Sequence, residues 1–252
     1  MITTTRLPRE LLDRVALQWN GNKSILGIQV FCKWRQKVIS DPKASASLKK
    51  QLKVPRNIYI YIGASRKKYF GWESFEYKDL DITKPEDFRR WFCPESIGAF
   101  LSEHTVEHIS YENMIRSFQL MHKYLMHGGY IRTALPVYTL GRKKHIFNSL
   151  EKAYGHINAL TVDELIEALK IAGFFDIRKL EYMDAKGFIH TADWDQCKGM
   201  IDRSVKYDYR NQLWRRNNRY NGLNLSRTDG IAQNIFKGKN ITASTIVDAY
   251  KQ

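Results

Sequence analysis

The sequence lacks any long apolar segment. No run of about 18 or more apolar residues occurs in the 252-residue chain, so the sequence predicts no helix that spans a membrane. The first ten residues also lack the apolar centre of a secretory signal peptide. Both absences favour a cytoplasmic protein.

Cysteine is scarce as well. The three cysteines, Cys32, Cys93 and Cys197, lie far apart and form no Cys-x-x-Cys pair. This spacing predicts neither a zinc site made of cysteines nor a disulfide framework. It agrees with a reducing cytoplasm.

Acidic residues are few compared with basic ones. The chain has 26 Asp and Glu against 41 Lys and Arg, which gives a net charge of +15. Residues 1–56 hold 12 of the basic residues and three acidic ones, and a second basic patch lies within residues 203–219. Such patches attract polyanions, including nucleic acid, anionic membranes and charged glycans. The alternative is a solvated surface without a specific partner, because positive charge alone gives only non-specific affinity.

The rest of the composition fits one α/β domain with extensions at both ends. Hydrophobic residues make up 43% of the chain, enough for a sizeable core. We expect a basic, mainly helical extension over residues 1–56 and a core domain over residues 57–192. A C-terminal extension over residues 193–252 would pack on this core. It is a candidate cap over the side of the binding site where the substrate (the acceptor) would enter.

Apolar segments rich in β-branched residues alternate with amphipathic helical segments across the core. Strands are expected at residues 57–63, 70–77, 80–82, 97–101, 130–136 and 174–180. Thr83, Ser110 and Thr161 each precede a segment with helical spacing and are predicted helix caps. This alternation predicts a doubly wound, mostly parallel α/β sheet with helices on both faces.

The segment from residue 97 to residue 109 is the strongest local signal. An apolar strand ends in Ser102-Glu103-His104, and Glu107-His108 follows directly. His104, Glu107 and His108 have the spacing of side chains that share one face of a helical turn. Open α/β sheets bind ligands at the carboxyl ends of their strands, so this segment is a candidate site.

A second candidate is the turn after the first strand, Gly63-Ala64-Ser65. Small residues there would let a nucleotide approach the backbone, and Glu76 after the second strand is placed to hold ribose hydroxyls. Taken alone, the turn is more typical of an ordinary tight connection between a strand and a helix, because it has a single glycine.

The order of these motifs along the chain resembles a known family. The motifs are Gly63-Ala-Ser65, Gly71-Trp72-x-x-x-Glu76, Asp81-Ile82, Ser102-Glu-His-Thr-Val-Glu-His108, Gly128-Gly129 and Gly155-His156. Together they resemble the class I S-adenosylmethionine-dependent methyltransferases, in particular the bacterial type 11 group, over roughly residues 57–180. The resemblance implies a Rossmann-like, seven-stranded methyltransferase sheet and S-adenosylmethionine as the cofactor.

The resemblance also implies roles for single residues. Gly63, Ala64 and Ser65 would line the methionine end of the cofactor, and Glu76 would hold the ribose hydroxyls. Asp81 would lie near the adenine amino group.

Three residues would border the reacting atoms: Ser102, Glu103 and His104. Ser102 is assigned to the cofactor, and Glu103 and His104 are the candidate catalytic residues. His104 could accept a proton from a hydroxyl or amine, since imidazole titrates near neutral pH.

Two departures from the family leave room for other functions. Ser65 stands where the family has glycine, and Pro136 is not followed by the acidic residue often found there. The reading we favour is a methyltransferase acting on a hydroxyl or amine of a small molecule or glycan. The alternatives are a degenerate domain that binds nucleic acid or a protein partner through residues 1–56, and an RNA methyltransferase. The sequence assigns neither the acceptor nor the oligomeric state.

For Glu107-His108, the resemblance favours a structural role, and no residue is assigned as a metal ligand. The alternative comes from small-RNA 2′-O-methyltransferases and ubiquinone-pathway O-methyltransferases, in which a similar Glu-x-x-Glu-His motif binds a divalent cation. His104 stands at the position of their first Glu. With His145 or His156 added, this alternative would be a nitrogen-rich site.

Overall fold

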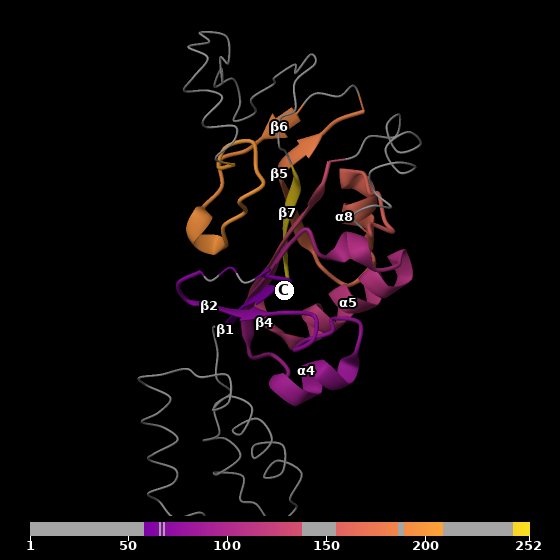
Figure 1. Ribbon diagram of the computed structural model, residues 1–252, viewed down its shortest axis with the longest axis vertical. Coiled ribbons are helices and arrows are strands. Elements are labelled where there is room, and N and C mark those ends of the chain that lie inside the picture. The colour runs from indigo at the N-terminus through magenta and orange to yellow at the C-terminus, as the bar shows by residue number, and fades with distance from the viewer. Residues whose placement is uncertain (1–57, 66, 68, 138–154, 186–188, 209–243) are drawn as a thin grey trace, which may run out of the picture.

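The described part of the chain is built on one seven-stranded sheet (Figure 1). The computed structural model describes residues 58–65, 67, 69–137, 155–185, 189–208 and 244–252, so the predicted extension over residues 1–56 lies outside it. The strands are β1 (Ile58–Ile62), β2 (Trp72–Phe75), β3 (Ile97–Glu103), β4 (Leu125–Pro136), β5 (Asp176–Met183), β6 (Ile189–Thr191) and β7 (Ser244–Tyr250). None of the helices in these residues has the length and apolarity needed to cross a membrane.

The sheet is mixed, which corrects the prediction of a mostly parallel one. Its strand order is β2-β1-β3-β4-β7-β5-β6. The three pairs from β2 to β4 are parallel, whereas β4–β7, β7–β5 and β5–β6 are antiparallel. The sequence did not reveal this because β7 comes from the C-terminal extension and inserts between β4 and β5. The short predicted strand at residues 80–82 does not form.

The strand order creates a switch point next to β1. From β1 the chain runs outward to β2 on one side and then returns to β3 on the other side. Ile62 at the end of β1 is in register with Phe75 of β2 and with Ser102 of β3. The carboxyl ends of these strands therefore lie side by side, at the place where open α/β sheets bind ligands.

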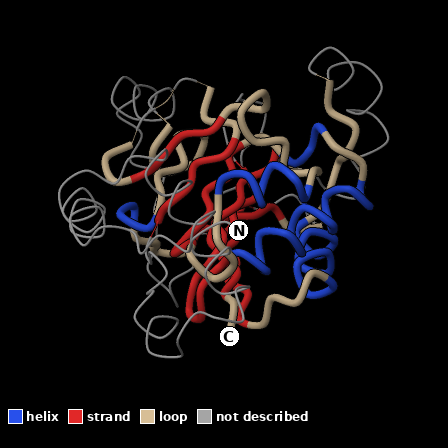
Figure 2. Tube along the Cα trace, turned by 90° about the horizontal axis from the view of Figure 1, so that it is seen from below, coloured by secondary structure: helices blue, strands red, loops and turns tan. Residues whose placement is uncertain are grey.

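Within the described residues, three α-helices cover one face of the sheet (Figures 1 and 2). They are α4 (Pro85–Trp91), α5 (Tyr111–Tyr124) and α8 (Val162–Ile171). Over the described residues, the prediction of helices on both faces is not met. Residues 192–208 cover the other face, with only the short 3-10 helix η2 (Gln196–Lys198).

Two of the three predicted helix caps are present in the structure. The Ser110 side chain accepts a hydrogen bond from the Asn113 backbone at the start of α5, and Thr161 forms a capping box at the start of α8. The predicted cap at Thr83 is wrong, because α4 begins at Pro85 without a side-chain cap. The Thr83 hydroxyl instead donates to Asp81.

A buried ion pair joins the sheet to the segment that covers its helix-free face. Arg132 of β4 donates to both carboxylate oxygens of Asp248 in β7, at 2.7 and 2.8 Å. Its remaining amino group donates to the backbone carbonyls of Asp195 and Gly199, each at 2.7 Å. The guanidinium also lies 4.7 Å from the ring centroid of Trp194. One arginine therefore holds β4, β7 and the covering segment together.

Cys93 corrects the reading of the cysteines. It is fully buried and its sulfur is in a disulfide, whereas Cys197 is free.

The Arg132 pair leads to a stability prediction. Arg132→Met should lower the free energy of unfolding by about 3–5 kcal/mol, because it leaves the buried Asp248 carboxylate without its partner. The matched control is Arg178→Met, which removes an exposed pair with Asp176 and should cost about 1 kcal/mol or less. Urea unfolding followed by circular dichroism measures both. Equal effects of the two variants would contradict this role.

Candidate functional site

The predicted cofactor residues from three separate segments meet at the switch point. Gly63-Ala64-Ser65 follows β1, Glu76 follows β2, and Ser102-Glu103-His104 ends β3 and begins the next turn. The Gly63 backbone N–H donates to the Phe75 carbonyl at 2.9 Å, which places Glu76 next to the turn. The structure therefore brings these segments together, although they are far apart in sequence.

The ends of β1 and β3 approach each other too closely for a side chain at residue 63. A Cβ atom added to Gly63 would lie 2.4 Å from the Thr105 hydroxyl oxygen, and the Gly63 φ angle is +63°. The Thr105 hydroxyl in turn lies 3.3 Å from the Ile62 and Glu103 carbonyls. Both the contact and the backbone angle favour glycine here. Ser65 in the same turn also has a positive φ, 48°, and its side chain is exposed.

This contact can be tested by substitution. Gly63→Ala should destabilise the fold by more than Gly71→Ala, since Gly71 also has a positive φ but has nothing within 4 Å of its added Cβ. The Gly71 control measures the backbone strain alone, about 1–2 kcal/mol. In Gly63→Ala combined with Thr105→Ala, the two losses should be less than additive. Equal losses at the two glycines would show that the close approach is absent.

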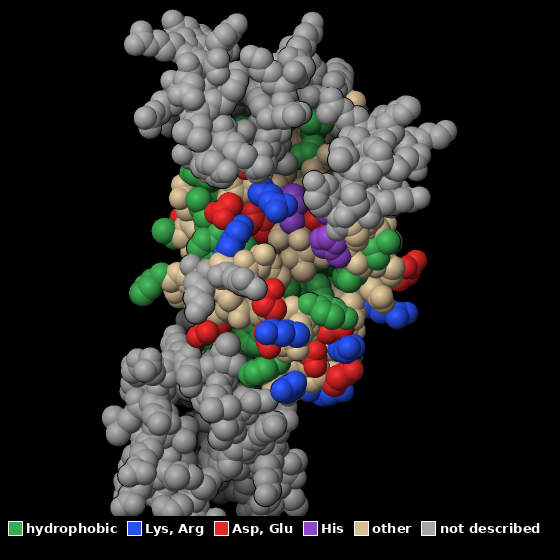
Figure 3. Space-filling view, viewed as in Figure 1, with side chains coloured by type: hydrophobic (Ala, Val, Ile, Leu, Met, Phe, Trp, Pro, Cys, Tyr) green, Lys and Arg blue, Asp and Glu red, His purple; other side chains and the backbone are tan. Residues whose placement is uncertain are grey.

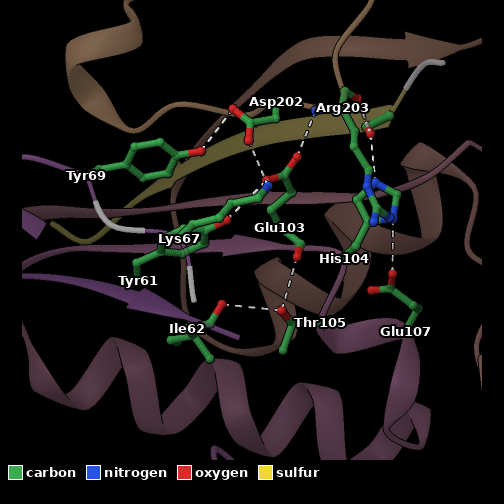
Figure 4. Close-up of polar contacts among 11 residues, drawn as sticks. Tyr61, Ile62, Lys67, Tyr69, Glu103, His104, Thr105, Glu107, Asp202 and Arg203 are labelled. Atoms are coloured by element: carbon green, nitrogen blue, oxygen red, sulfur yellow. Dashed lines mark hydrogen bonds and ion pairs between the residues drawn. The ribbon is translucent and has the colours of Figure 1, made fainter. Parts of the chain in front are cut away.

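Glu103 is the centre of a buried polar network (Figure 4). One carboxylate oxygen accepts from the Tyr61 hydroxyl at 3.1 Å and from Lys67 Nζ at 2.8 Å. The other accepts from the Arg203 backbone N–H at 2.8 Å. Lys67 also lies 2.8 Å from Asp202, which accepts from the Tyr69 hydroxyl at 2.9 Å. Through these contacts, the Glu103 carboxylate fixes the positions of the Tyr61 hydroxyl, the Lys67 ammonium and the Arg203 backbone.

The network determines the charge of this edge of the sheet. Burial alone would lower the pKa of Lys67, but hydrogen bonds and charge from Asp202 and Glu103 outweigh it and raise that pKa. The ammonium and its stabilising contribution are therefore present at neutral pH and are lost only above the ordinary lysine range. Burial, with the charge of Glu103, also raises the pKa of Tyr61, so its phenol stays neutral and can donate.

Asp81 and Ser102 were also predicted site residues, but neither makes a hydrogen bond to the Glu103 network. The Asp81 carboxylate accepts from the Thr83 backbone and hydroxyl and lies 3.1 Å from Lys84 Nζ, so its contacts hold the turn before α4. The Ser102 hydroxyl is fully buried and has no hydrogen-bond partner among the described residues. The cofactor roles of both residues stay predictions.

His104 lies just beyond β3 in a left-handed backbone conformation, with φ at +52°. Its Nε2 is 2.9 Å from the Ser244 hydroxyl, and its Nδ1 is 3.3 Å from Glu107 Oε1 (Figure 4). Ser244 also donates to the Arg203 carbonyl. Although the order Ser–His–Glu is that of a hydrolase triad, Ser244 is fully buried and is not an accessible nucleophile.

Sequence reasoning missed several residues of this site. Lys67 belongs to a short basic run that has the appearance of a solvated turn, while Asp202 and Ser244 come from C-terminal segments with weak periodicity. Asp202 lies 135 positions from Lys67 in the numbering and is brought to it only by the covering segment. No local pattern signals such a contact.

The fold and this edge define a Rossmann-like α/β protein with a polar switch point. No known family profile and no curated protein sequence matches the chain. Its structure is similar to those of S-adenosylmethionine-dependent methyltransferases. One, from Thermotoga maritima, is described as a possible histamine N-methyltransferase; the identity is 11%, 96% of this chain and 97% of that chain are covered, and the TM-score is 0.40.

Two further structures have similar scores. A methyltransferase from Archaeoglobus fulgidus is 13% identical, with 94% of this chain and 99% of that chain covered and a TM-score of 0.42. Phosphoethanolamine N-methyltransferase 2 from Haemonchus contortus, bound to phosphomonomethylethanolamine and S-adenosylhomocysteine, is 13% identical, with 93% of this chain but only 59% of that chain covered and a TM-score of 0.41. At these scores the likeness by itself supports no conclusion about activity.

Proposed function

We propose that the protein is an S-adenosylmethionine-dependent methyltransferase that acts on a hydroxyl or amine of a small molecule or glycan. One observation carries the proposal. The residues to which the motif resemblance gives cofactor roles in three separate segments, around Gly63, Glu76 and Ser102, meet at the switch point of the sheet.

The chemistry of the edge suits this cofactor. The turn Gly63-Ala64-Ser65 has small side chains; Ala64 is buried, Gly63 is partly exposed and Ser65 is exposed. A carboxylate such as Glu76 can accept hydrogen bonds from both hydroxyls of a ribose. Lys67, which lies 2.8 Å from both Glu103 and Asp202, offers a partner to the carboxylate of the cofactor.

The contacts of the two candidate catalytic residues support positioning roles. Methyl transfer from a sulfonium mainly requires donor and acceptor to be held in line. Glu103 holds Lys67, Tyr61 and the Arg203 backbone at the edge where the donor would bind. His104 already contacts Ser244 and Glu107 with its two ring nitrogens. Proton transfer by His104 stays a prediction.

Calorimetric titration with S-adenosylmethionine tests this proposal. The folded protein should bind one equivalent, and Glu76→Gln should weaken binding by about 10–100-fold, because a charge-assisted hydrogen bond contributes roughly 1.5–3 kcal/mol. The matched control is Glu86→Gln, an exposed residue in α4 away from the switch point. Absence of binding at millimolar cofactor, with intact folding, would reject the proposal.

The basic composition supports a second function, binding to nucleic acid. Residues 1–56 carry 12 Lys and Arg against three acidic residues. If this segment binds RNA or DNA, affinity should fall steeply with salt and be lost on deletion of residues 1–56. Salt-dependent binding together with cofactor binding would indicate an RNA methyltransferase, and salt-dependent binding alone would indicate a non-catalytic domain. Affinity unchanged by the deletion would exclude this role for the segment.

A further inference from the structure

A row of aromatic side chains crosses the sheet near the amino ends of its parallel strands. Strand register places one residue from each of the neighbouring strands β2, β1, β3, β4 and β7 in this row: Trp72, Tyr59, Ala99, Tyr130 and Tyr250. Residues opposite each other on neighbouring strands point to the same face of a sheet. At a strand spacing of about 4.8 Å, the row is roughly 19 Å long.

The row lies on the helix-free face of the sheet. Tyr130 is two positions from Arg132 in β4, and side chains two positions apart in a strand share a face. Tyr250 has the same relation to Asp248, the partner of Arg132. The segment over residues 192–208 binds Arg132 on this face. Side chains of the hydrophobic and aromatic group reach the surface on the left of Figure 3, the side opposite the α-helices.

The rings of the row are partly exposed. They form two pairs, Tyr59 with Trp72 at 5.3 Å between centroids, and Tyr130 with Tyr250 at 5.5 Å. All four are partly exposed, whereas Ala99 between the pairs is fully buried, so the accessible surface of the row belongs to the rings. The three tyrosines belong to neither hydrophobic cluster of the described core. Core packing therefore does not account for them.

Two exposed cations border one end of the row. The Arg178 guanidinium lies 4.8 Å and Lys198 Nζ lies 5.8 Å from the ring centroid of Tyr250. The Tyr130 hydroxyl donates to the Lys198 carbonyl at 2.9 Å, which fixes the Lys198 backbone beside the rings. Arg178 also binds Asp176, but both side chains are about half exposed, and an exposed pair is weak enough for another anion to share the guanidinium.

Rings and cations side by side suit one chemical class of partner. Aromatic side chains stack on unpaired bases of any sequence, and nearby cations hold the phosphates between those bases. In other proteins, aromatic residues on the open face of a sheet bind single-stranded RNA in this way. At the 3.4 Å rise of a stacked strand, the row has room for about five nucleotides. A duplex keeps the faces of its bases inside the stack, so it offers such a row less contact.

We propose that this aromatic row binds single-stranded nucleic acid, with bases stacked on its four rings and phosphates held by Arg178 and Lys198. The net charge of +15 attracts the strand, and the rings select unpaired bases. The inference goes beyond nucleic-acid binding through residues 1–56, because charge alone favours a duplex, which carries more charge per unit length. It requires neither cofactor binding nor methyl transfer.

Fluorescence anisotropy with a labelled oligothymidylate of about 15 nucleotides tests the proposal on the full chain. The single strand should bind more tightly than its duplex with oligoadenylate, a comparison that needs no variant. Tyr59→Leu and Tyr250→Leu should each weaken binding by about 5–150-fold, the loss expected for one stacked base, because leucine is apolar but has no ring face. The matched control is Tyr77→Leu, an exposed tyrosine beyond the carboxyl end of β2, which should leave affinity unchanged. Circular dichroism checks the folding of each variant.

Salt dependence separates this surface from the basic segment. Tyr250→Leu should lower affinity at every salt concentration and leave the slope of log affinity against log salt unchanged, since it removes no charge. Lys198→Gln should reduce that slope by about 0.7, the value for one phosphate contact on a single strand. Deletion of residues 1–56 should leave the preference for the single strand over the duplex intact.

Four results would overturn the proposal. The folded full chain does not bind the single strand, it binds the duplex as tightly, or Tyr77→Leu weakens binding as much as Tyr250→Leu. The fourth is binding of a neutral glucose oligomer, but not of the oligonucleotide, that is lost in Tyr250→Leu, which would assign the row to a glycan. None of these results bears on S-adenosylmethionine binding, which is measured separately by calorimetry.

Discussion

The close approach of Gly63 and Thr105 is the constraint on which the candidate site depends. It brings the carboxyl ends of β1 and β3 together at a point where a side chain on residue 63 would overlap the threonine. The turn after β1 is thereby held against Glu103 and His104, and Glu76 lies beside it through the register of β2. The close contact between this turn and Thr105, which follows β3, explains why residue 63 must be glycine.

Buried charged side chains hold the segment over residues 192–208 on the helix-free face of the sheet. Arg132, Glu103 and Glu181 each bind backbone groups of the segment over residues 192–208. Such groups are costly to bury unless they are paired, so each fixes the position of the segment it contacts. The segment in turn supplies Asp202 to Lys67.

The sequence predicted the features that depend on local chemistry. The first strand, the helix caps at Ser110 and Thr161, and the meeting of three motifs at strand ends follow from periodicity, capping and topology. It did not predict β7, whose place between β4 and β5 depends on pairing of Asp248 with a residue 116 positions away. The Lys67 network was missed for the same reason, since it is made by residues distant in sequence. The cap expected at Thr83 failed because its hydroxyl bonds to Asp81 instead.

The central claim is that the ends of β1, β2 and β3 form a nucleoside site. A crystal structure of the full chain grown with S-adenosylhomocysteine tests it most directly. Our account predicts the nucleoside between Gly63 and Glu76, with both ribose hydroxyls on the Glu76 carboxylate and the amino-acid end near Lys67. A nucleoside bound elsewhere on the chain, or an unchanged edge in protein saturated with the ligand, would contradict it.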